Sequence, residues 1–297
     1  MQHVRFPDGH TCPALGLGTW RMGESERERP REVAALRLAL EIGYRVIDTA
    51  EMYGEGGAEE VVGQALAEAL RAGSVRRDEV FVVSKVYPHN ASRIGVRTAC
   101  ERSRRRLGLD RIDLFLLHWR GSHPLAETLA GFEALLAQGH IARWGVSNFD
   151  LDDMEELADV RGGSACAANQ VYYSLGERGA GHALLPWLQR QGLPLMAYCP
   201  IDQGVLAANA RLAELAARKG ASAAQLALAW AMQQGGVMAI PKAVREAHLR
   251  ENFAAAAITL APEDLAALDA IFPPPRRKTA LHCNIVLGAA ASACPAG

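Results

Sequence analysis

The sequence lacks the features that mark membrane and secreted proteins. None of its apolar stretches approaches the run of about 18 consecutive apolar residues that a membrane-spanning helix needs. The N-terminus, MQHVRFPDGHTCPALG, has no basic head followed by an apolar run, which is the pattern of a secretory signal. We therefore expect neither a signal peptide nor a membrane partner.

Clustered cysteine is also missing. The 6 cysteines, at positions 12, 100, 166, 199, 283 and 294, are widely scattered and form no CxxC pair. Zinc sites and small disulfide frameworks both need closely spaced cysteines, so the spacing favours neither. We expect reduced thiols, no bound metal and a cytoplasmic location.

Charge of one sign is not in excess. The chain has 32 Lys and Arg against 33 Asp and Glu, a formal net charge of −1, which gives no reason to expect a polyanionic partner. The run RSRRR at 102–106 is the local exception, but it has no interleaved aromatic residues. We interpret it as the solvated face of a helix and expect no nucleic acid as a partner.

Short apolar or β-branched runs are present, and they alternate with longer segments of helical period. The runs are LGLGT (15–19), YRVID (44–48), VFVVSK (80–85), DLFLLH (113–118), RWGVSN (143–148), ANQVY (168–172), LPLMAY (193–198) and VMAIPK (237–242). Strands that alternate with helices form parallel sheets. Eight such units in about 250 residues predict a closed (β/α)8 TIM barrel, with a doubly wound sheet as the alternative.

The helix between the first two runs carries both boundary signals. Pro30 suits a first helical turn, Val33, Leu36 and Leu40 share one face, and Gly43 ends the helix. Further helices are predicted at 58–71, 92–107, 126–138, 152–159, 182–191 and 209–234, the last broken at Gly220.

The ends of the chain add a hairpin and a tail. HVRF and TCPAL, joined by residues 7–10, predict a β-hairpin laid across one end of the barrel. No linker interrupts the repeat, so we expect residues 1–281 to form one domain. The small residues of 282–297 have no clear period and predict a loosely held C-terminal tail.

Polar residues end most of the predicted strands. They are Asp48, Lys85, His118, Asn148, Gln170, Tyr198 and Lys242. Taken singly, each is explained by solvation at the end of a strand. Together they form a ring at the C-terminal mouth of the barrel, where barrel enzymes build their active sites, and Asp48, Lys85 and His118 could shift one another's proton affinities.

The residues at these strand ends and around them resemble those of the aldo-keto reductase family. The resemblance is greatest to its bacterial methylglyoxal-reductase-type and 2,5-diketo-gluconate-reductase-like members. The matching stretches are GLGTW (16–20), DTAEMYGEGGAEEVVGQAL (48–66), SKVY (84–87), DLFLLHW (113–119), WGVSNF (144–149), NQVYYSL (169–175), AYCPI (197–201) and IPKAVREAHLREN (240–252). The resemblance implies NAD(P)H-dependent reduction of an aldehyde or ketone.

The resemblance further implies a catalytic tetrad of Asp48, Tyr53, Lys85 and His118. A tyrosine with a pKa near ~10 is a poor proton donor at neutral pH, so we expect the Lys85 ammonium to lower the pKa of Tyr53. Asp48 would hold Lys85 charged, and His118 would orient and polarise the carbonyl. A Schiff-base lysine at Lys85 is the alternative, against which the nicotinamide-binding motifs argue.

The cofactor site implied by the resemblance does not use a Rossmann turn, since GxGxxG is missing: Gly54 and Gly56 are followed by Glu59. It assigns the nicotinamide to Thr19, Asp48, Ser147, Asn148, Gln170 and Tyr198, and the rest of the cofactor to Cys199, Pro200, Ile201, Ile240, Lys242, Ala243, His248, Glu251 and Asn252. Ala243 and His248 stand where the family usually has a hydroxyl residue and an arginine. We expect NADP(H) to be preferred, with NAD(H) as the alternative.

The substrate pocket implied by the resemblance is aromatic, at Trp20, Tyr87 and Trp119. The short tail favours small carbonyl compounds such as methylglyoxal as substrates. A nicotinamide-binding regulatory or sensor subunit with little turnover is the alternative function. Such a protein need not retain all four tetrad residues, so their joint presence favours the enzyme.

Overall fold

The computed structural model describes residues 1–282, so almost all of the predicted tail lies outside the described residues. In this range, eight parallel strands lie side by side in chain order. They are β3 (Leu17–Gly18), β4 (Val46–Asp48), β5 (Phe81–Val86), β6 (Leu114–Leu117), β7 (Trp144–Ser147), β8 (Asn169–Tyr172), β9 (Leu195–Tyr198) and β10 (Val237–Ala239). All eight predicted strands are confirmed, with their ends shifted by a few residues.

The sheet closes on itself. Leu15 forms a parallel bridge with Ala239, and Gly18 forms one with Lys242. The Gly16 amide donates to the Ala239 carbonyl at 2.9 Å. A Cβ atom at Gly18 would lie 2.8 Å from the Ile240 carbonyl oxygen, so only glycine allows the first and last strands to approach this closely. The predicted (β/α)8 barrel is confirmed, and closure rules out the doubly wound alternative.

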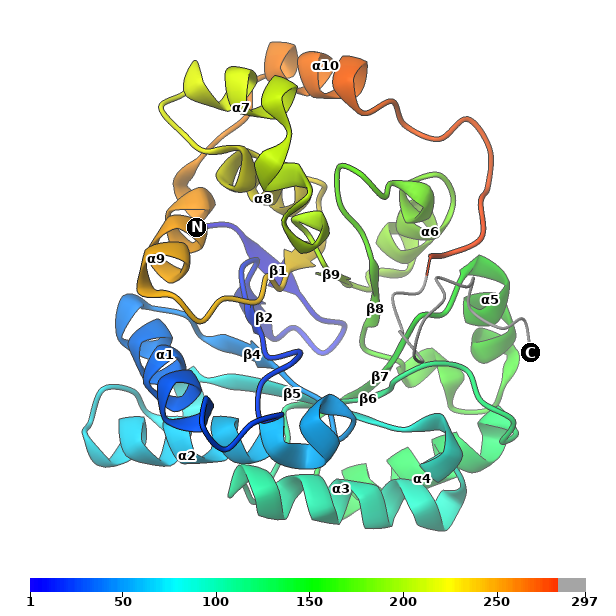
Figure 1. The fold of residues 1–297 in the computed structure, drawn as a ribbon. Helices are drawn as coiled ribbons and strands as arrows, with labels where there is room; N and C mark the ends of the chain where they lie inside the picture. Colours follow the sequence, from blue (N-terminus) through cyan, green and yellow to red (C-terminus); the bar gives the residue numbers. More distant parts are fainter. Residues whose placement is uncertain (283–297) are drawn as a thin grey trace.

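Helices surround the strands (Figure 1). They are α1 (Arg29–Ile42), α2 (Gly57–Arg71), α3 (Arg93–Leu107), α4 (Leu125–Ala137), α5 (Leu151–Asp159), α6 (Leu184–Gln191), α7 (Ala210–Ala217), α8 (Ala223–Met232), α9 (Glu246–Ala254) and α10 (Pro262–Ile271). The break predicted at Gly220 falls between α7 and α8. In α1, Val33, Leu36 and Leu40 are buried as predicted, and the helix ends directly before Gly43. No helix within residues 1–282 is long and apolar enough to cross a membrane.

The sequence did not predict α9 and α10. The signal for α10 was nevertheless present, because Pro262 occupies the first turn and the Asp264 carboxylate accepts from the Ala261 amide at 2.7 Å. Helix α9 has only Leu249 and Asn252 buried, so it carries no clear apolar stripe. Its position beside the mouth of the barrel comes from tertiary packing: the Tyr44 hydroxyl donates to the Leu249 carbonyl at 3.0 Å.

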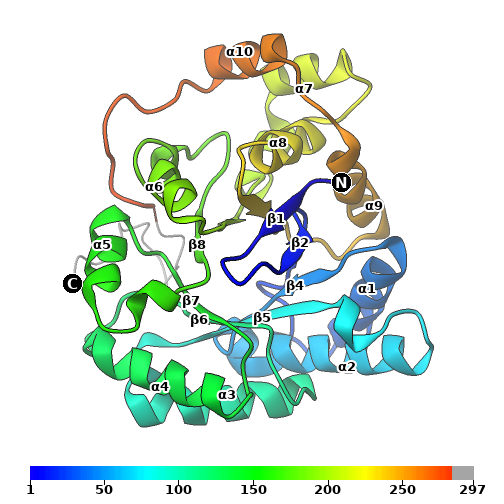
Figure 2. The same ribbon diagram turned by 180° about the vertical axis from the view of Figure 1, so that it is seen from behind.

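The predicted N-terminal hairpin is also present. Strands β1 (His3–Arg5) and β2 (Thr11–Pro13) pair antiparallel. The ring of Phe6, next to β1, stacks on that of Phe81 at the start of β5, with the centroids 5.2 Å apart. The hairpin therefore covers the N-terminal end of the barrel and lies in front when the molecule is seen from behind (Figure 2). The opposite end, where the strands exit, is left for the site.

The interpretation of residues 102–106 as a solvated face is wrong for two of the arginines. Arg102 and Arg106 on α3 turn toward buried carboxylates of Glu51 and Glu59, at 3.0 and 2.6 Å. Arg105 fits the prediction, since its side chain is 69% exposed. Helical periodicity could not separate them, because the sequence does not show which buried acids face the helix.

Candidate active site

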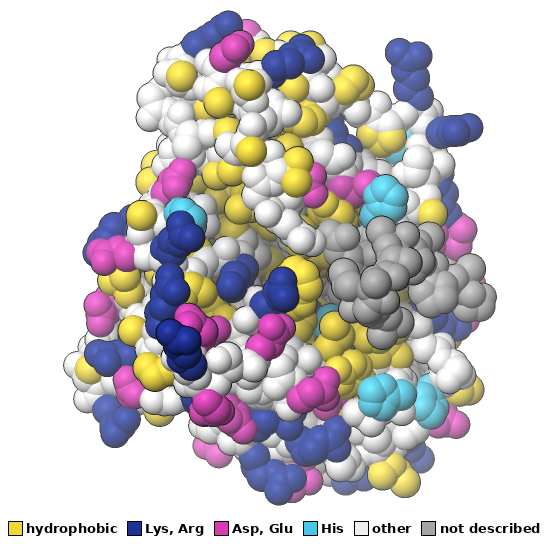
Figure 3. All heavy atoms as spheres, in the orientation of Figure 1, with side chains coloured by type: hydrophobic (Ala, Val, Ile, Leu, Met, Phe, Trp, Pro, Cys, Tyr) yellow, Lys and Arg dark blue, Asp and Glu magenta, His cyan; other side chains and the backbone are white. Residues whose placement is uncertain are grey.

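A cavity of about 490 Å³ opens at the C-terminal ends of the strands. In the space-filling view, Lys and Arg side chains gather beside this hollow, near the starts of α1 and α9 (Figure 3). Most of the predicted site residues line the cavity. They are Trp20, Asp48, Tyr53, His118, Ser147, Asn148, Gln170, Tyr198, Cys199, Pro200, Ile201, Ile240, Lys242, His248, Glu251 and Asn252.

The other predicted residues lie around the cavity. Thr19, Lys85 and Ala243 are buried in its wall. The Thr19 hydroxyl donates to the Asp48 backbone carbonyl at 3.0 Å, which ties β3 to the exit of β4. Tyr87 and Trp119 lie outside the lining, with their rings edge to face at 6.0 Å. The ring of Trp119 is 4.9 Å from that of His118, so these aromatic residues extend the site from His118 outward.

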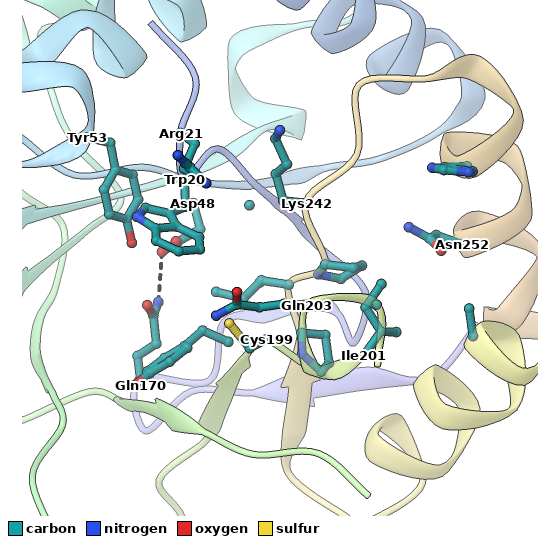
Figure 4. Close-up of a pocket in the computed structure, with 18 of the residues that line it drawn as sticks. Trp20, Arg21, Asp48, Tyr53, Gln170, Cys199, Ile201, Gln203, Lys242 and Asn252 are labelled. Atoms are coloured by element: carbon teal, nitrogen blue, oxygen red, sulfur yellow. Dashed lines mark hydrogen bonds between the residues drawn. The ribbon is translucent and has the colours of Figure 1, made fainter. Parts of the chain in front are cut away.

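Lys85 is the centre of the polar cluster at one end of the cavity. Its Nζ donates to Asp48 Oδ2 at 2.8 Å, to the Thr49 carbonyl at 2.9 Å and to the Tyr53 hydroxyl at 3.1 Å. The other oxygen of Asp48 accepts from Gln170 Nε2 at 2.7 Å (Figure 4). Three bonds satisfy the three protons of the ammonium, which explains how a fully buried lysine is accommodated.

Tyr53 lies in a tight turn, Tyr53–Gly56, directly before α2. The sequence-based expectation was that Lys85 lowers the pKa of its phenol, but the pKa of Tyr53 is raised well above the ordinary value. Burial is the largest cause, and the charge of Asp48 acts in the same direction. The ammonium of Lys85 lies 3.1 Å from the phenol but is paired with the Asp48 carboxylate at 2.8 Å, so its favourable effect on a tyrosinate does not outweigh burial.

His118 ends the set at the exit of β6. Its ring meets that of Tyr53 edge to face at 5.7 Å. The pKa of His118 is lowered well below 6.5, first by burial and then by the positive charge of Lys85. Within residues 1–282 the Nδ1 atom has no hydrogen-bond partner. A neutral imidazole with an unsatisfied ring nitrogen next to a phenol can orient a small oxygen-containing ligand.

We expect His118 to remain neutral from pH 8 down through its ordinary pKa of 6.5. In this window the unfolded chain takes up a proton that the folded chain does not, so His118 makes the free energy of unfolding fall as pH drops below 6.5. Titration of the imidazole by NMR, assigned by its loss in His118→Asn, tests this. A His118 signal that titrates near 6.5 contradicts the expectation.

Amide and hydroxyl groups surround the phenol of Tyr198 at the ends of β7 to β9. The Tyr198 hydroxyl donates to Asn148 Oδ1 at 2.8 Å. Asn148 Nδ2 donates to Ser147 Oγ at 3.1 Å and to the His118 carbonyl at 3.0 Å. Asn148 has φ +58°, a left-handed conformation that asparagine tolerates better than most residues. The ring of Tyr198 and the amide of Asn148 are thereby fixed relative to each other.

At the opposite end of the cavity lies α9, which carries His248, Glu251 and Asn252, and Lys242 lies between the two ends. Figure 4 shows Tyr53 and Gln170 at one end and Asn252 at the other. Desolvation in the cavity lining lowers the pKa of Lys242, and the negative charge of Glu32 opposes this effect. The cavity thus joins a polar, aromatic end to an end formed by α9, with the ammonium of Lys242 between them.

Sequence reasoning missed several lining residues. They are Gly18, Arg21, Met52, Gln203, Gly204, Ala207, Ala224 and Pro241. Gln203 and its neighbour Asp202 have φ +51° and +53°, and Cys199 has φ +50°. Three non-glycine residues in this sparsely populated region, within one loop after β9, mark a backbone that its surroundings hold in a strained form. The motif AYCPI gave no sign of it, because strain depends on tertiary contacts.

A closed barrel with a cavity at the C-terminal ends of its strands is typical of barrel enzymes, and comparison with known proteins identifies the class as oxidoreductases. Residues 14–272 match the model of the Aldo/keto reductase family. The chain therefore belongs to this family, and the predicted resemblance is confirmed.

Individual relatives cover nearly the whole chain. Methylglyoxal reductase YeaE of Escherichia coli (strain K12) is 50% identical over 94% of this chain and 97% of its own length. Glyoxal reductase of Bacillus subtilis (strain 168) is 34% identical, over 90% and 92% respectively. A crystal structure of an aldo-keto reductase from Klebsiella pneumoniae in complex with NADPH is 49% identical, with a TM-score of 0.89 over 95% of this chain and 99% of that one.

Proposed function

We propose that this protein catalyses the NADPH-dependent reduction of small aldehydes and ketones, with methylglyoxal as one substrate, to alcohols. The observation that carries the proposal is the buried chain Asp48–Lys85–Tyr53, with contacts of 2.8 and 3.1 Å, beside a cavity. The proposal agrees with the names of the methylglyoxal and glyoxal reductases to which the chain is similar. We also propose that residues 1–281 act as one domain, and that the enzyme is cytoplasmic, which the buried thiols of Cys12, Cys100 and Cys166 support.

The donor set of the cavity fits a nicotinamide dinucleotide. Gln170, Asn148 and Ser147 offer amide and hydroxyl groups to a carboxamide, next to the aromatic face of Tyr198. Lys242 and His248 would face phosphate, and Glu251 and Asn252 an adenine edge. In this assignment Cys199, Pro200, Ile201, Ile240 and Ala243 supply the walls between the two ends.

When bound, the reduced nicotinamide supplies a hydride to the carbonyl carbon. The raised pKa keeps Tyr53 protonated at neutral pH, and the phenol would give this proton to the carbonyl oxygen as negative charge develops there during hydride addition. Lys85 would stabilise the phenolate left behind through its 3.1 Å contact, and Asp48 would hold Lys85 in the charged form. Neutral His118 would orient the carbonyl oxygen toward Tyr53.

The direct test is loss of NADPH absorbance on addition of methylglyoxal, simple aldehydes, ketoses and aromatic aldehydes, compared as kcat/KM. We expect turnover with the small aldehydes, greatest for α-oxoaldehydes. Tight NADPH binding without turnover on any carbonyl compound would favour the regulatory or sensor subunit and contradict the enzyme.

Cofactor choice gives a further prediction. His248 lines the cavity, and a guanidinium in its place is always charged and can bind phosphate through two parallel hydrogen bonds, which an imidazole cannot make. His248→Arg is therefore expected to strengthen NADPH binding about 3- to 10-fold and to leave NADH unchanged. Fluorescence titration of both cofactors measures this. An equal gain for NADH would show that His248 does not face the 2′-phosphate.

A further inference from the structure

Two ion pairs, each with a buried carboxylate and a partly exposed arginine, lie directly behind the polar cluster and have no part in the reaction described above. Arg102 Nη2 lies 3.0 Å from Glu51 Oε2, and Arg106 Nη2 lies 2.6 Å from Glu59 Oε2. The side chains of Glu51 and Glu59 are only 5% and 0% exposed. Burying a carboxylate is costly unless it is paired and hydrogen-bonded, so each acid must have a definite set of partners.

Both carboxylates accept hydrogen bonds from the segment that carries Lys85. Glu59 Oε1 accepts from the Ser84 hydroxyl at 2.5 Å, and Ser84 directly precedes Lys85. Glu51 Oε1 accepts from the Tyr87 amide at 2.8 Å, just after β5 ends. The Glu51 amide in turn donates to the Lys85 carbonyl at 3.3 Å. The strand end is thus held on both sides of the lysine.

The same acids lie on either side of Tyr53 in the sequence, two residues before it and six residues after it. Arg106 also packs on the turn that follows Tyr53. A Cβ atom at Gly56, whose φ is +96°, would lie 2.6 Å from Arg106 Nε, so the guanidinium occupies the place of a side chain there. One helix, α3, therefore supports the loop with Tyr53 and the strand with Lys85 together.

We propose that the residues of two ion pairs, Arg102–Glu51 and Arg106–Glu59, are positioning residues. They hold the Lys85 ammonium and the Tyr53 hydroxyl at the distance that the reaction needs. The inference rests on the proposed function. The two groups come from different elements and meet at 3.1 Å. An error of about 1 Å in such a contact can cost on the order of 100-fold in rate. Charged partners on one rigid helix give the required precision, because each allows only a narrow range of geometries.

Glu59 also acts through its charge. The ionisable groups that face Lys85 are Asp48, Tyr53, His118 and Glu59, while Glu59 itself faces Arg106 and the buried thiol of Cys100. Burial lowers the pKa of Lys85, and Asp48 and, to a smaller extent, the negative charge of Glu59 act against this. Removing the negative charge of Glu59 should therefore lower the pH at which the Lys85–Tyr53 pair loses a proton. Removing the positive charge of Arg106 should raise that pH.

The test compares Glu59→Gln and Arg106→Gln with Arg105→Gln, a control on the same helix whose side chain is 69% exposed. We expect Glu59→Gln and Arg106→Gln each to lose about tenfold or more in kcat with methylglyoxal, with NADPH affinity unchanged. The alkaline limb of the kcat profile should move to lower pH in Glu59→Gln and to higher pH in Arg106→Gln, by roughly half a unit to one unit. Arg105→Gln should match the wild type.

The inference would be overturned if the alkaline limb moved in the same direction in Glu59→Gln and Arg106→Gln, or did not move in either. A general loosening of the fold would not depend on whether the removed charge was negative or positive. Thermal unfolding shows whether each variant is folded. If Glu59→Gln or Arg106→Gln does not fold, Arg102→Gln decides, because Arg102 is 37% exposed and we expect its replacement to leave the fold intact. This variant should lose about tenfold in kcat, and wild-type activity would contradict the proposal. Turnover by the wild type in the same assay separates these outcomes from failure of the proposed function, which would show as no turnover at all.

Discussion

Tyr53→Phe is expected to bind NADPH with near wild-type affinity and to lose at least about 100-fold in kcat. The substitution removes the hydroxyl that lies 3.1 Å from Lys85 Nζ and leaves the ring in place against His118. General acid catalysis is typically worth 100-fold or more, so loss of the donor should appear in turnover rather than in binding. Cofactor titration by fluorescence and steady-state rates give the two quantities separately.

Tyr173→Phe is the matched control for this change. Tyr173 is buried, lies outside the cavity lining and differs from phenylalanine by the same single hydroxyl. It should retain wild-type kcat. A Tyr53→Phe enzyme that keeps more than about a tenth of kcat would show that another group donates the proton, and the tetrad assignment would be wrong.

Lys85→Met is expected to lose at least about 100-fold in kcat and about 3 to 5 kcal/mol in free energy of unfolding. The ammonium donates to Asp48 at 2.8 Å in a pair whose side chains are 0% and 3% exposed. Its removal leaves a buried carboxylate without its counterion, which is the costly way to break such a pair. Chemical denaturation and steady-state kinetics measure the two effects.

The double variant Asp48→Asn with Lys85→Met separates stability from catalysis. A neutral amide at position 48 can still accept the 2.7 Å hydrogen bond from Gln170, and no charge is left buried. We expect most of the lost stability to return while kcat stays low. Equal stability of Lys85→Met and the wild type would contradict the cost assigned to the unpaired carboxylate, and recovered activity in the double variant would contradict the role of Lys85.

The sequence by itself determined the framework of this protein. Alternation of short apolar runs with helical segments predicts a parallel closed barrel, because each strand must be covered and each crossover needs a helix. The spacing of Asp48, Lys85 and His118 by about one repeat predicts that they meet at one end of the barrel. Both inferences depend only on periodicity and connectivity, which are properties of the chain order.

Tertiary structure alone decided how these groups behave. The pKa of Tyr53 moves upward because burial and Asp48 outweigh Lys85, a balance that depends on distances between three elements. Arg102 and Arg106 turn inward because α3 happens to face Glu51 and Glu59, whereas Arg105, one residue away from Arg106, stays in solvent. Charge interactions and burial vary over a few ångströms, and only the packed fold sets separations on that scale.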